Sequence, residues 1–413
     1  MNIKLLLLSL ALHFACQAHA FYSRNTVYDE NIMSLQAVVN SDWLSPAVMT
    51  LGSSDVLNIS FDELSHDYIR YTYHIDHCEA DWSLSEGIFE SDYLRGFNDN
   101  VIDDFETSVN TTVLYTHYTF SIPNDRCRLT LSGNYRLTIC DEDGNAAATV
   151  DFMVAEKTMT LGLGVTTNTD IDVRGSHQQV LLTLNYDNVD VTNPEEQLYT
   201  VIMKNDCPEE VRINVKPDIK SNKGMQWNHC RDLIFDGGNE YYKYEVLDVS
   251  HATLGLESVT WDGEYFNAWV NTTKPRSNYL YDEDADGAFY IRNSDNIDND
   301  ITSDYIFVHY RHKSPLLTKG LRVEGRWTSD ADKTFYDMNY DGAEEMYYTE
   351  VLQKQGYYSY RYVMVDENGA ISAPYNEGSF YQTENRYQGY VYFKGRGERT
   401  WRLVAYRQTI YKP

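Results

Sequence analysis

Short runs of alternating apolar and polar residues restrict the fold of this chain more than any other feature. Between positions 69 and 76, every second residue is large and apolar: Ile69, Tyr71, Tyr73 and Ile75. This period of two is typical of a β-strand with one buried face, because successive side chains of a strand point to opposite sides. Similar runs rich in Tyr, Val, Ile and Thr recur between clusters of Gly, Asn and Asp, and the chain has 35 tyrosines but only 9 prolines. The sequence therefore predicts an almost all-β protein.

Two stretches far apart in the chain predict β-hairpins of similar design. The first, 129–154, places the turn DEDGN at 141–145 between two alternating segments, and Gly and Asn tolerate the positive φ that such turns require. The second, GYYSYRYVMVDENG at 356–369, repeats the order of Gly, Tyr two residues later, an alternating strand and an acidic turn ending in Gly. We interpret both as parts of related immunoglobulin-like sandwiches, although any hairpin tends to share these features.

The length of 413 residues favours several domains. Strands are expected at 178–185, 198–204 and 241–247, whereas the Asp- and Asn-rich stretch 277–300 is expected to be a loop. We therefore expect three β domains, at 22–156, 157–300 and 301–413. The expected fold class is a tandem of immunoglobulin- or fibronectin-like antiparallel β-sandwiches.

Residues 1–20 have the pattern of a secretory signal peptide. Lys4 precedes an apolar core that is too short to span a bilayer, and Ala18-His19-Ala20 is a small-x-small cleavage site. A lipoprotein anchored through Cys16 is the alternative, but the residues before this cysteine fit a lipidation box badly. No later window has the roughly 18 consecutive apolar residues of a membrane helix. We therefore expect an exported, water-soluble protein, unless the chain forms a β-barrel.

Charge and cysteine content narrow the class of protein further. The net charge of −28 argues against nucleic acid as a partner, because its phosphates would be repelled. Five cysteines remain after removal of the signal: Cys78, Cys127, Cys140, Cys207 and Cys230. An odd number leaves at least one free thiol. The sequence does not decide whether one or two disulfides form.

The stretch YTYHIDHCEADW at 71–82 raises the question of a metal site. On a helix, His74, His77 and Cys78 would share one face, as zinc ligands do. The period-two pattern predicts a strand instead, on which His74 and His77 point to opposite faces. His74 and Cys78 would then stand about 13 Å apart, too far to bind one ion. We therefore expect a structural strand with His77 at the end of its buried row.

One acidic loop is a candidate calcium site, and no motif predicts catalysis. DEDADG at 282–287 places Asp282, Asp284 and Asp286 at the first three ligand positions of a calcium loop. Position 12 is Asn293, where a bidentate Glu belongs, so a plain acidic turn is the alternative. The chain has no G-x-S-x-G, H-E-x-x-H or P-loop motif. The sequence therefore gives no positive evidence for an enzyme and indicates no catalytic residues.

Several phrases resemble the plug protein family of the bacterial type IX (Por) secretion system. The phrases that carry the resemblance include NTVYDENIMSLQ at 25–36, Trp-Leu-Ser-Pro at 43–46, IDHCEADW at 75–82, YLRGFNDN at 93–100, IFDGGNEYYKYEV at 234–246 and EGSFYQTENRYQGYVYF from 377. The match extends over most of the chain and is loose at 247–345. The resemblance implies a non-enzymatic periplasmic protein that closes the periplasmic opening of a large outer-membrane β-barrel translocon. It implies a protein partner and no cofactor.

The family phrase near the C-terminus contains our candidate partner-binding residues. Tyr381, Glu384, Asn385 and Tyr387 lie in GSFYQTENRY, and tyrosine is favoured at protein interfaces. Packing inside a sandwich is the alternative for the same residues. Two other functions stay open at this point: an exported carbohydrate-binding or substrate-capture module, and a membrane β-barrel. Against a barrel, the apolar rows are short and the chain ends on Tyr411-Lys412-Pro413.

Overall fold

The computed structural model describes residues 25–413 and is all-β, with 5% of residues in helices and 47% in strands. This confirms the fold class predicted from the alternating pattern. The predicted signal peptide, together with Cys16, lies outside the described residues. None of the helices in the described part of the chain has the length and apolar character that a membrane span requires.

The first unit, residues 26–155, consists of two sheets packed face to face. The larger sheet contains β1 (Thr26–Val27), β12 (Ala146–Ala155), β11 (Gly133–Cys140), β5 (Tyr71–Cys78) and β7 (Asn100–Ile102), with β3 (Val48–Thr50) beside β12. The second sheet has the order β2 (Ile32–Val39), β4 (Leu57–Glu63), β9 (Thr116–Ile122) and β8 (Phe105–Thr107). A short pair, β6 (Leu94–Gly96) with β10 (Cys127–Leu129), follows α2 (Glu90–Tyr93). Buried residues of both sheets, such as Phe61 and Tyr71, form one apolar cluster between them.

The second unit combines residues 160–236 with residues 385–411. One sheet contains β13 (Thr160–Thr166), β14 (His177–Asn185), β18 (Gly224–Trp227) and β17 (Ile219–Ser221), with β19 (Ile234–Asp236) also on β14. The other has the order β16 (Val211–Ile213), β15 (Leu198–Lys204), β30 (Asn385–Phe393) and β31 (Arg402–Tyr411). Two short helical turns, α3 (Pro194–Gln197) and η1 (Arg231–Leu233), connect these strands. The register pairs Leu198 with Phe393, so the end of the chain completes a sheet begun near its middle.

The inserted unit, residues 242–372, lies between these two parts of the second unit. Its ten strands form one hydrogen-bonded network around a single apolar cluster. In path order the strands are β20 (Tyr242–Val246), β28 (Gly356–Val365), β25 (Gly320–Glu324), β26 (Asp337–Asp341), β27 (Met346–Lys354), β24 (Tyr305–Lys313), β22 (Phe266–Val270) and β21 (Leu256–Trp261). Two more, β23 (Phe289–Ile291) and β29 (Ile371–Ser372), pair with β28. The short helices are α4 (Asn299–Thr302) and η2 (Lys333–Tyr336).

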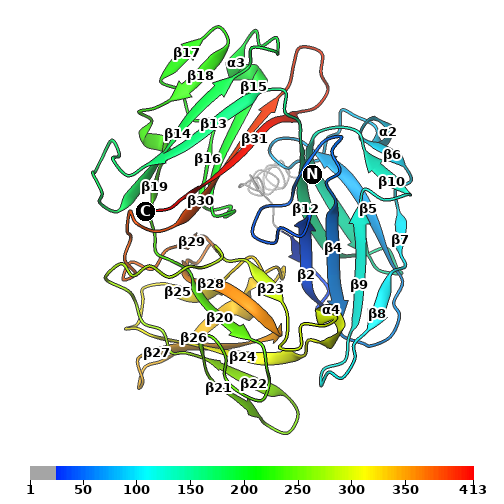
Figure 1. Ribbon diagram of the computed structural model, residues 1–413, viewed down its shortest axis with the longest axis vertical. Helices are drawn as coiled ribbons and strands as arrows, with labels where there is room; N and C mark the ends of the chain where they lie inside the picture. Colours follow the sequence, from blue (N-terminus) through cyan, green and yellow to red (C-terminus); the bar gives the residue numbers. More distant parts are fainter. Residues whose placement is uncertain (1–24) are drawn as a thin grey trace, which may run out of the picture.

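The three units surround a common centre (Figure 1). The red C-terminal strands lie beside the green strands of the second unit, and the yellow and orange inserted unit lies below both. This pairing runs across the expected boundary at residue 300. We propose three domains that coincide with the three units, the second of which is discontinuous. The immunoglobulin-like topology stays a prediction, with which the two-sheet arrangement of the first and second units is compatible.

Local expectations for strands and turns are confirmed. β5 buries Tyr71, Tyr73 and Ile75, and His77 ends the row at 2% exposure. β14, β15 and β20 occupy the three strand positions expected in the middle of the chain. The two hairpin turns share their chemistry: Asp141 Oδ1 accepts hydrogen bonds from the backbone N–H groups of residues 143 and 145, and Asp366 Oδ1 does so from residues 368 and 370.

The stretch 277–300 is more structured than the expected loop. Most of it has no regular structure, but it contains β23 and the start of α4. β23 pairs with β28 from Phe289 to Ile291. A strand of three residues is too short to show an alternating pattern. The high content of Asp and Asn around β23 therefore favoured the prediction of a loop.

Candidate functional site

A cavity of 320 Å³ lies between the second unit and the inserted unit. Residues from two family phrases line it: Asp236–Glu240 of FDGGNE and Glu377–Ser379 of EGSF. About 140 positions separate the two phrases in the chain. Each phrase lies in one of the two segments by which the chain passes between these units, after β19 and after β29, and we call these segments the crossings. The cavity is therefore the place where the most distinctive parts of the sequence come together.

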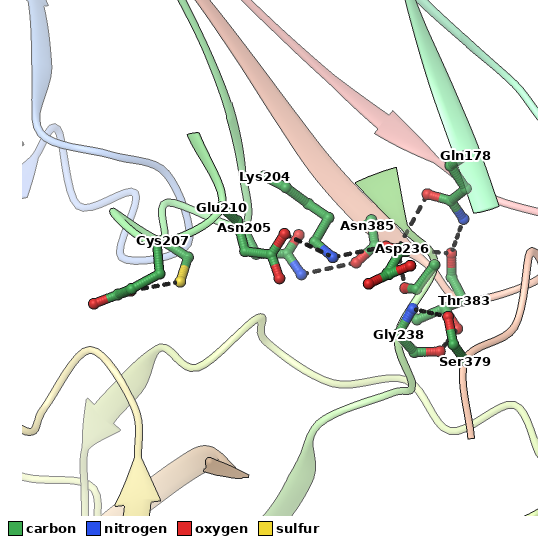
Figure 2. Close-up of polar contacts among 12 residues, drawn as sticks. Gln178, Lys204, Asn205, Cys207, Glu210, Asp236, Gly238, Ser379, Thr383 and Asn385 are labelled. Atoms are coloured by element: carbon green, nitrogen blue, oxygen red, sulfur yellow. Dashed lines mark hydrogen bonds and ion pairs between the residues drawn. The ribbon is translucent and has the colours of Figure 1, made fainter. Parts of the chain in front are cut away.

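Hydrogen bonds join the two crossings directly (Figure 2). The backbone N–H of Gly238 donates to Ser379 Oγ at 3.1 Å, and its carbonyl accepts from Thr383 Oγ1 at 2.9 Å. The Asn385 amide donates to the carbonyl of Gly237 at 2.8 Å, and Gln178 donates to the carbonyl of Thr383 at 2.8 Å. Every one of these groups is buried or half-buried, so this network replaces water for the backbone of both crossings.

Gly237 permits the close approach of the two crossings. A Cβ atom at this position would lie 2.0 Å from the carbonyl oxygen of Phe380 and 2.6 Å from its carbon. Both are backbone atoms, so the contact could not be relieved by a side-chain rotation. The first glycine of GGNE is thus required by packing between two chain segments, and the second, with φ of +69°, by backbone conformation.

Basic side chains surround the half-buried carboxylate of Glu210 on one side of the cavity. Lys204 Nζ lies 3.5 Å from Glu210 Oε2 and donates to the backbone carbonyl of Asp236 at 2.8 Å (Figure 2). Burial alone would raise the pKa of Glu210, but Lys204, Arg361 and Arg212 outweigh it and lower this pKa. Arg361 also pairs with Glu324 at 2.7 Å and donates to Cys207 Sγ at 3.0 Å. The charges here are neutralised within the protein.

The other side of the cavity is organised around Arg276. Its Nε donates to Glu377 Oε1 at 2.6 Å, and its guanidinium lies 3.9 Å from the ring centroid of Tyr242. Burial raises the pKa of Glu240, whose Oε1 accepts from Tyr279 at 2.6 Å. Burial and the Arg276 charge lower the pKa of His312 to about 4, so this imidazole is neutral near pH 7. Acids and bases are therefore paired around this cavity, and the hydrogen bond from Arg361 to Cys207 Sγ joins the inserted unit to the second unit.

The carboxylates of the three calcium candidates accept hydrogen bonds or form ion pairs with other groups of the protein. Asp282 pairs with Lys243 at 2.6 Å, and the carboxylate of Asp284 accepts from the backbone N–H groups of Tyr241 and Asp286. Asp286 pairs with Arg386 at 3.4 Å. Burial, and then the neighbouring Asp286, raise the pKa of Asp284 well above its usual value. Within residues 25–413, no group of three or more His, Cys, Asp or Glu side chains is arranged to hold a metal ion.

The candidate partner-binding residues divide between surface and interior. Tyr387 and Asn385 are 0% and 2% exposed, and both bond to Gln178. The packing interpretation therefore describes these two residues. Tyr381 and Glu384 are half-buried, and Glu384 pairs with Lys412 at 3.1 Å. A role of Tyr381 or Glu384 in binding a partner stays a proposal.

The histidines and cysteine of YTYHIDHCEADW have separate structural partners. His77 lies with its two nitrogens 2.8 Å from Ser85 Oγ and 3.2 Å from the carbonyl of Ser132. His74 lies between Asp76 and Asp99 on the opposite face of β5. Cys78 is buried in an apolar cluster. The five cysteines among residues 25–413 form no disulfide with one another.

The Trp-Leu-Ser-Pro phrase contacts both other units, which sequence reasoning did not anticipate. Trp43 packs on Tyr290 and Tyr357 of the inserted unit, with ring centroids 5.4 and 6.1 Å away. The carbonyl of Leu44 accepts from Arg326 at 2.9 Å, and Ser45 Oγ accepts from Gln408 of the second unit at 2.9 Å. A tryptophan in a loop with little alternation was the available signal for an inter-unit contact.

These features define a class: a multi-unit all-β protein whose distinctive residues serve contacts between its units. The comparisons then identify the family. The description "Type 9 secretion system plug protein 1st domain" matches residues 32–156. A crystal structure of a hypothetical protein from Parabacteroides merdae ATCC 43184, at 2.30 Å resolution, is 32% identical, with a TM-score of 0.90. The similarity covers 94% of this chain and 99% of that one. None of the curated proteins matches this chain.

The chain belongs to the type 9 secretion system plug protein family. Membership associates it with a component of this secretion system and with the cell envelope. The family suggests a structural role for the protein.

Proposed function

We propose that the chain is a non-enzymatic plug that closes the periplasmic opening of the outer-membrane β-barrel translocon of type IX secretion. The family match in the first unit is the observation that carries the proposal. A large barrel has a water-filled lumen through which solutes leak unless something fills or covers it. A stopper acts by occupying space, so it needs breadth and rigidity and no reactive group.

The arrangement of the three units supplies the breadth. A compact chain of 413 residues has a radius of gyration of about 22 Å. Each unit touches the other two: Tyr392 donates to Asn134 at 2.8 Å, Lys354 pairs with Asp62 at 2.6 Å, and Arg386 pairs with Asp286 at 3.4 Å. These contacts join all three pairs of units, so the units form one broad body in this arrangement.

Co-purification tests the proposed partner. A tagged chain is isolated from the outer membrane after mild solubilisation, and bound proteins are identified by mass. We expect a large β-barrel to be recovered with the chain. A chain recovered without a barrel contradicts the proposal, and retention on polysaccharide would instead support a carbohydrate-binding module.

Permeability tests the proposed action. Cells that lack the chain should admit a large hydrophilic antibiotic that the intact outer membrane excludes, and the wild-type chain should restore exclusion. The matched control deletes the translocon as well, since leakage through the barrel then disappears. Leakage that persists in this double deletion contradicts closure of the barrel by the chain.

A further inference from the structure

The three units are not joined by equivalent contacts. Of the four buried apolar clusters found among residues 25–413, three are confined to single units. The fourth is shared by the first and second units: Cys78, Ala80, Trp82, Met153, Ala155, Val201, Met203, Tyr390, Tyr392 and Leu403. The backbone N–H of Glu156 also donates to the carbonyl of Leu403 at 2.8 Å. The first and second units therefore share a continuous apolar core.

Polar groups join the inserted unit to the first unit. Lys354 of β27 pairs with Asp62 of β4 at 2.6 Å, and their side chains are 1% and 0% exposed. The other oxygen of Asp62 lies 2.6 Å from His117 Nδ1, and Tyr305 donates to the Asp62 carboxylate at 2.6 Å. Lys354 also donates to the carbonyl of Asp300 at 2.5 Å. We call Asp62, His117, Tyr305 and Lys354 the latch.

Further contacts across this interface are aromatic as well as polar: the buried rings of Tyr115 and Tyr305 meet edge to face, with centroids 5.3 Å apart. The carboxylate of Asp304 accepts from the backbone N–H groups of Thr112 and Val113 at 2.8 and 3.0 Å. The backbone of Val27 exchanges hydrogen bonds with residues 329 and 331. The half-buried Trp43 supplies an aromatic contact at the edge. If the two units separate, water can replace these hydrogen bonds and rehydrate both charges of the latch.

Cavities also separate the inserted unit from its neighbours. One of 110 Å³ is lined by Trp43, Met153, Asp206, Phe289 and Arg326, which come from all three units. Another of 40 Å³ lies between Leu35 and Trp327, near the latch. Both are partly open clefts, so part of the surface between the inserted unit and its neighbours is not in direct contact. Separation here loses fewer apolar contacts than separation of the first and second units.

The inserted unit is connected covalently to the second unit by two neighbouring crossings of the chain. The chain enters it after β19 through residues 237–241 and leaves it after β29 through residues 373–384. The two crossings bond to each other through Gly238 and Ser379 and through Gly238 and Phe380. Neither crossing contains a strand, so a few backbone torsions there can change without disturbing a sheet.

We propose that the inserted unit is a hinged body that swings about the paired crossings at Gly237–Gly238 and Ser379–Phe380. The latch holds it closed against the first unit, and the first and second units stay together as one rigid body. This device gives the chain two shapes, one closed and one open, without unfolding of any unit. The inference concerns the conformation of the chain and does not depend on the identity of its partner.

Distances between spin labels test the swing. The half-buried Cys140 is first replaced by Ser, and exposed residues are then changed in pairs: Asp143→Cys with Glu344→Cys, and Asp143→Cys with Asn188→Cys. The first pair joins the first and inserted units, and the second pair joins the first and second units. Lys354→Met is expected to lengthen the first distance by about 5 Å or more, or to broaden its distribution equally, and to leave the second distance unchanged.

The matched control is Arg136→Met, which breaks a half-buried ion pair with Asp151 inside the first unit. It should alter neither distance. If Lys354→Met leaves both distances unchanged, or shifts both together, the hinge is refuted.

Hydrogen exchange tests the same idea on the unmodified chain and decides it if Lys354→Met does not fold. The amides of Thr112 and Val113 are protected by Asp304 of the inserted unit, whereas Ser108 in the same loop is protected by Tyr115 of its own unit. We expect the first two to exchange at least about tenfold faster than Ser108 and than Glu156, which is protected by the second unit. Equal protection of all four amides would overturn the proposal.

Discussion

Lys354 Nζ lies 2.6 Å from Asp62 Oδ2, although the two residues are 292 positions apart in the chain. Neither side chain is more than 1% exposed, so each charge depends on the other and on the hydrogen bonds around it. Burial raises the pKa of Asp62, but Lys354 and then His117 outweigh it, and the pKa is lowered overall. Asp62 is therefore ionised at neutral pH.

Removal of one partner should be costlier than removal of both. Lys354→Met leaves the Asp62 carboxylate buried without its cation, and we expect the free energy of unfolding to fall by about 3–5 kcal/mol. The double variant Asp62→Leu with Lys354→Met leaves no unpaired charge and should be more stable than Lys354→Met alone. Urea unfolding of the four proteins in the cycle measures both effects. Additive losses would show that the two charges do not interact.

His74 and His312 should titrate at widely different pH values. A hydrogen bond to Asp76, opposed by burial and supported by Asp99, raises the pKa of His74 to about 9. Burial and Arg276 lower the pKa of His312 to about 4. NMR titration of the imidazole carbons should find His74 charged and His312 neutral at pH 7. The side chain of Asp99 is 77% exposed, so its substitution should perturb the fold little. Asp99→Asn should lower the pKa of His74 and leave the pKa of His312 unchanged.

The signs of the linked stability effects follow from these directions. His74 stabilises the fold fully below its unfolded pKa of 6.5, and this contribution is lost as the pH rises through about 9. The neutral His312 contributes above pH 6.5, and this contribution is lost as the pH falls toward about 4. Melting temperatures of His312→Gln that fall with acid as steeply as those of the wild type would contradict this assignment.

Gly237→Ala should destabilise the chain through a backbone clash. The added methyl group would lie 2.0 Å from the carbonyl oxygen of Phe380, so one crossing must move away from the other. We expect a loss of about 1–3 kcal/mol in the free energy of unfolding. Gly162→Ala in β13 is the matched control, because the nearest atom to its new Cβ is 3.6 Å away. Equal effects of the two substitutions would argue against close contact of the crossings.

Calcium should not stabilise the protein. Asp282, Asp284 and Asp286 are engaged with Lys243, with backbone N–H groups and with Arg386. We expect the melting temperature to stay within about 1 °C when millimolar calcium is added or a chelator removes it, since a specific ligand would raise it by mass action. Magnesium at equal ionic strength controls for screening. A rise specific to calcium would establish a site at this loop.

Local structure could be predicted wherever a pattern was complete within a few residues. The alternation from Tyr71 to Ile75 was sufficient for β5, and the acidic turns ending in Gly144 and Gly369 were sufficient for two hairpins. The phrases of the plug family were sufficient for the family itself. These signals depend on neighbours in the chain, which one sequence displays directly.

Contacts between distant segments could not be predicted. Asp62, His117 and Lys354 each look like an ordinary polar residue in a strand, and nothing local indicates that they meet. The pairing of β15 with β30 joins residues about 190 positions apart, and the expected boundary at residue 300 reflected only changes in local composition. The cavity beside Gly238 likewise requires both crossings to be placed first.

The split of the second unit also sets an order of folding during synthesis. β15 waits for β30 and β31, which emerge from the ribosome only after the whole inserted unit has been made. Until then, Val201 and Met203 have no neighbouring strand on the edge of β15 that later pairs with β30. The apolar surface that they share with the first unit stays exposed to solvent. The second unit can therefore complete its sheet only after the last strands have been synthesised. A product that ends before residue 385 would expose the unpaired edge of β15 to chaperones and proteases.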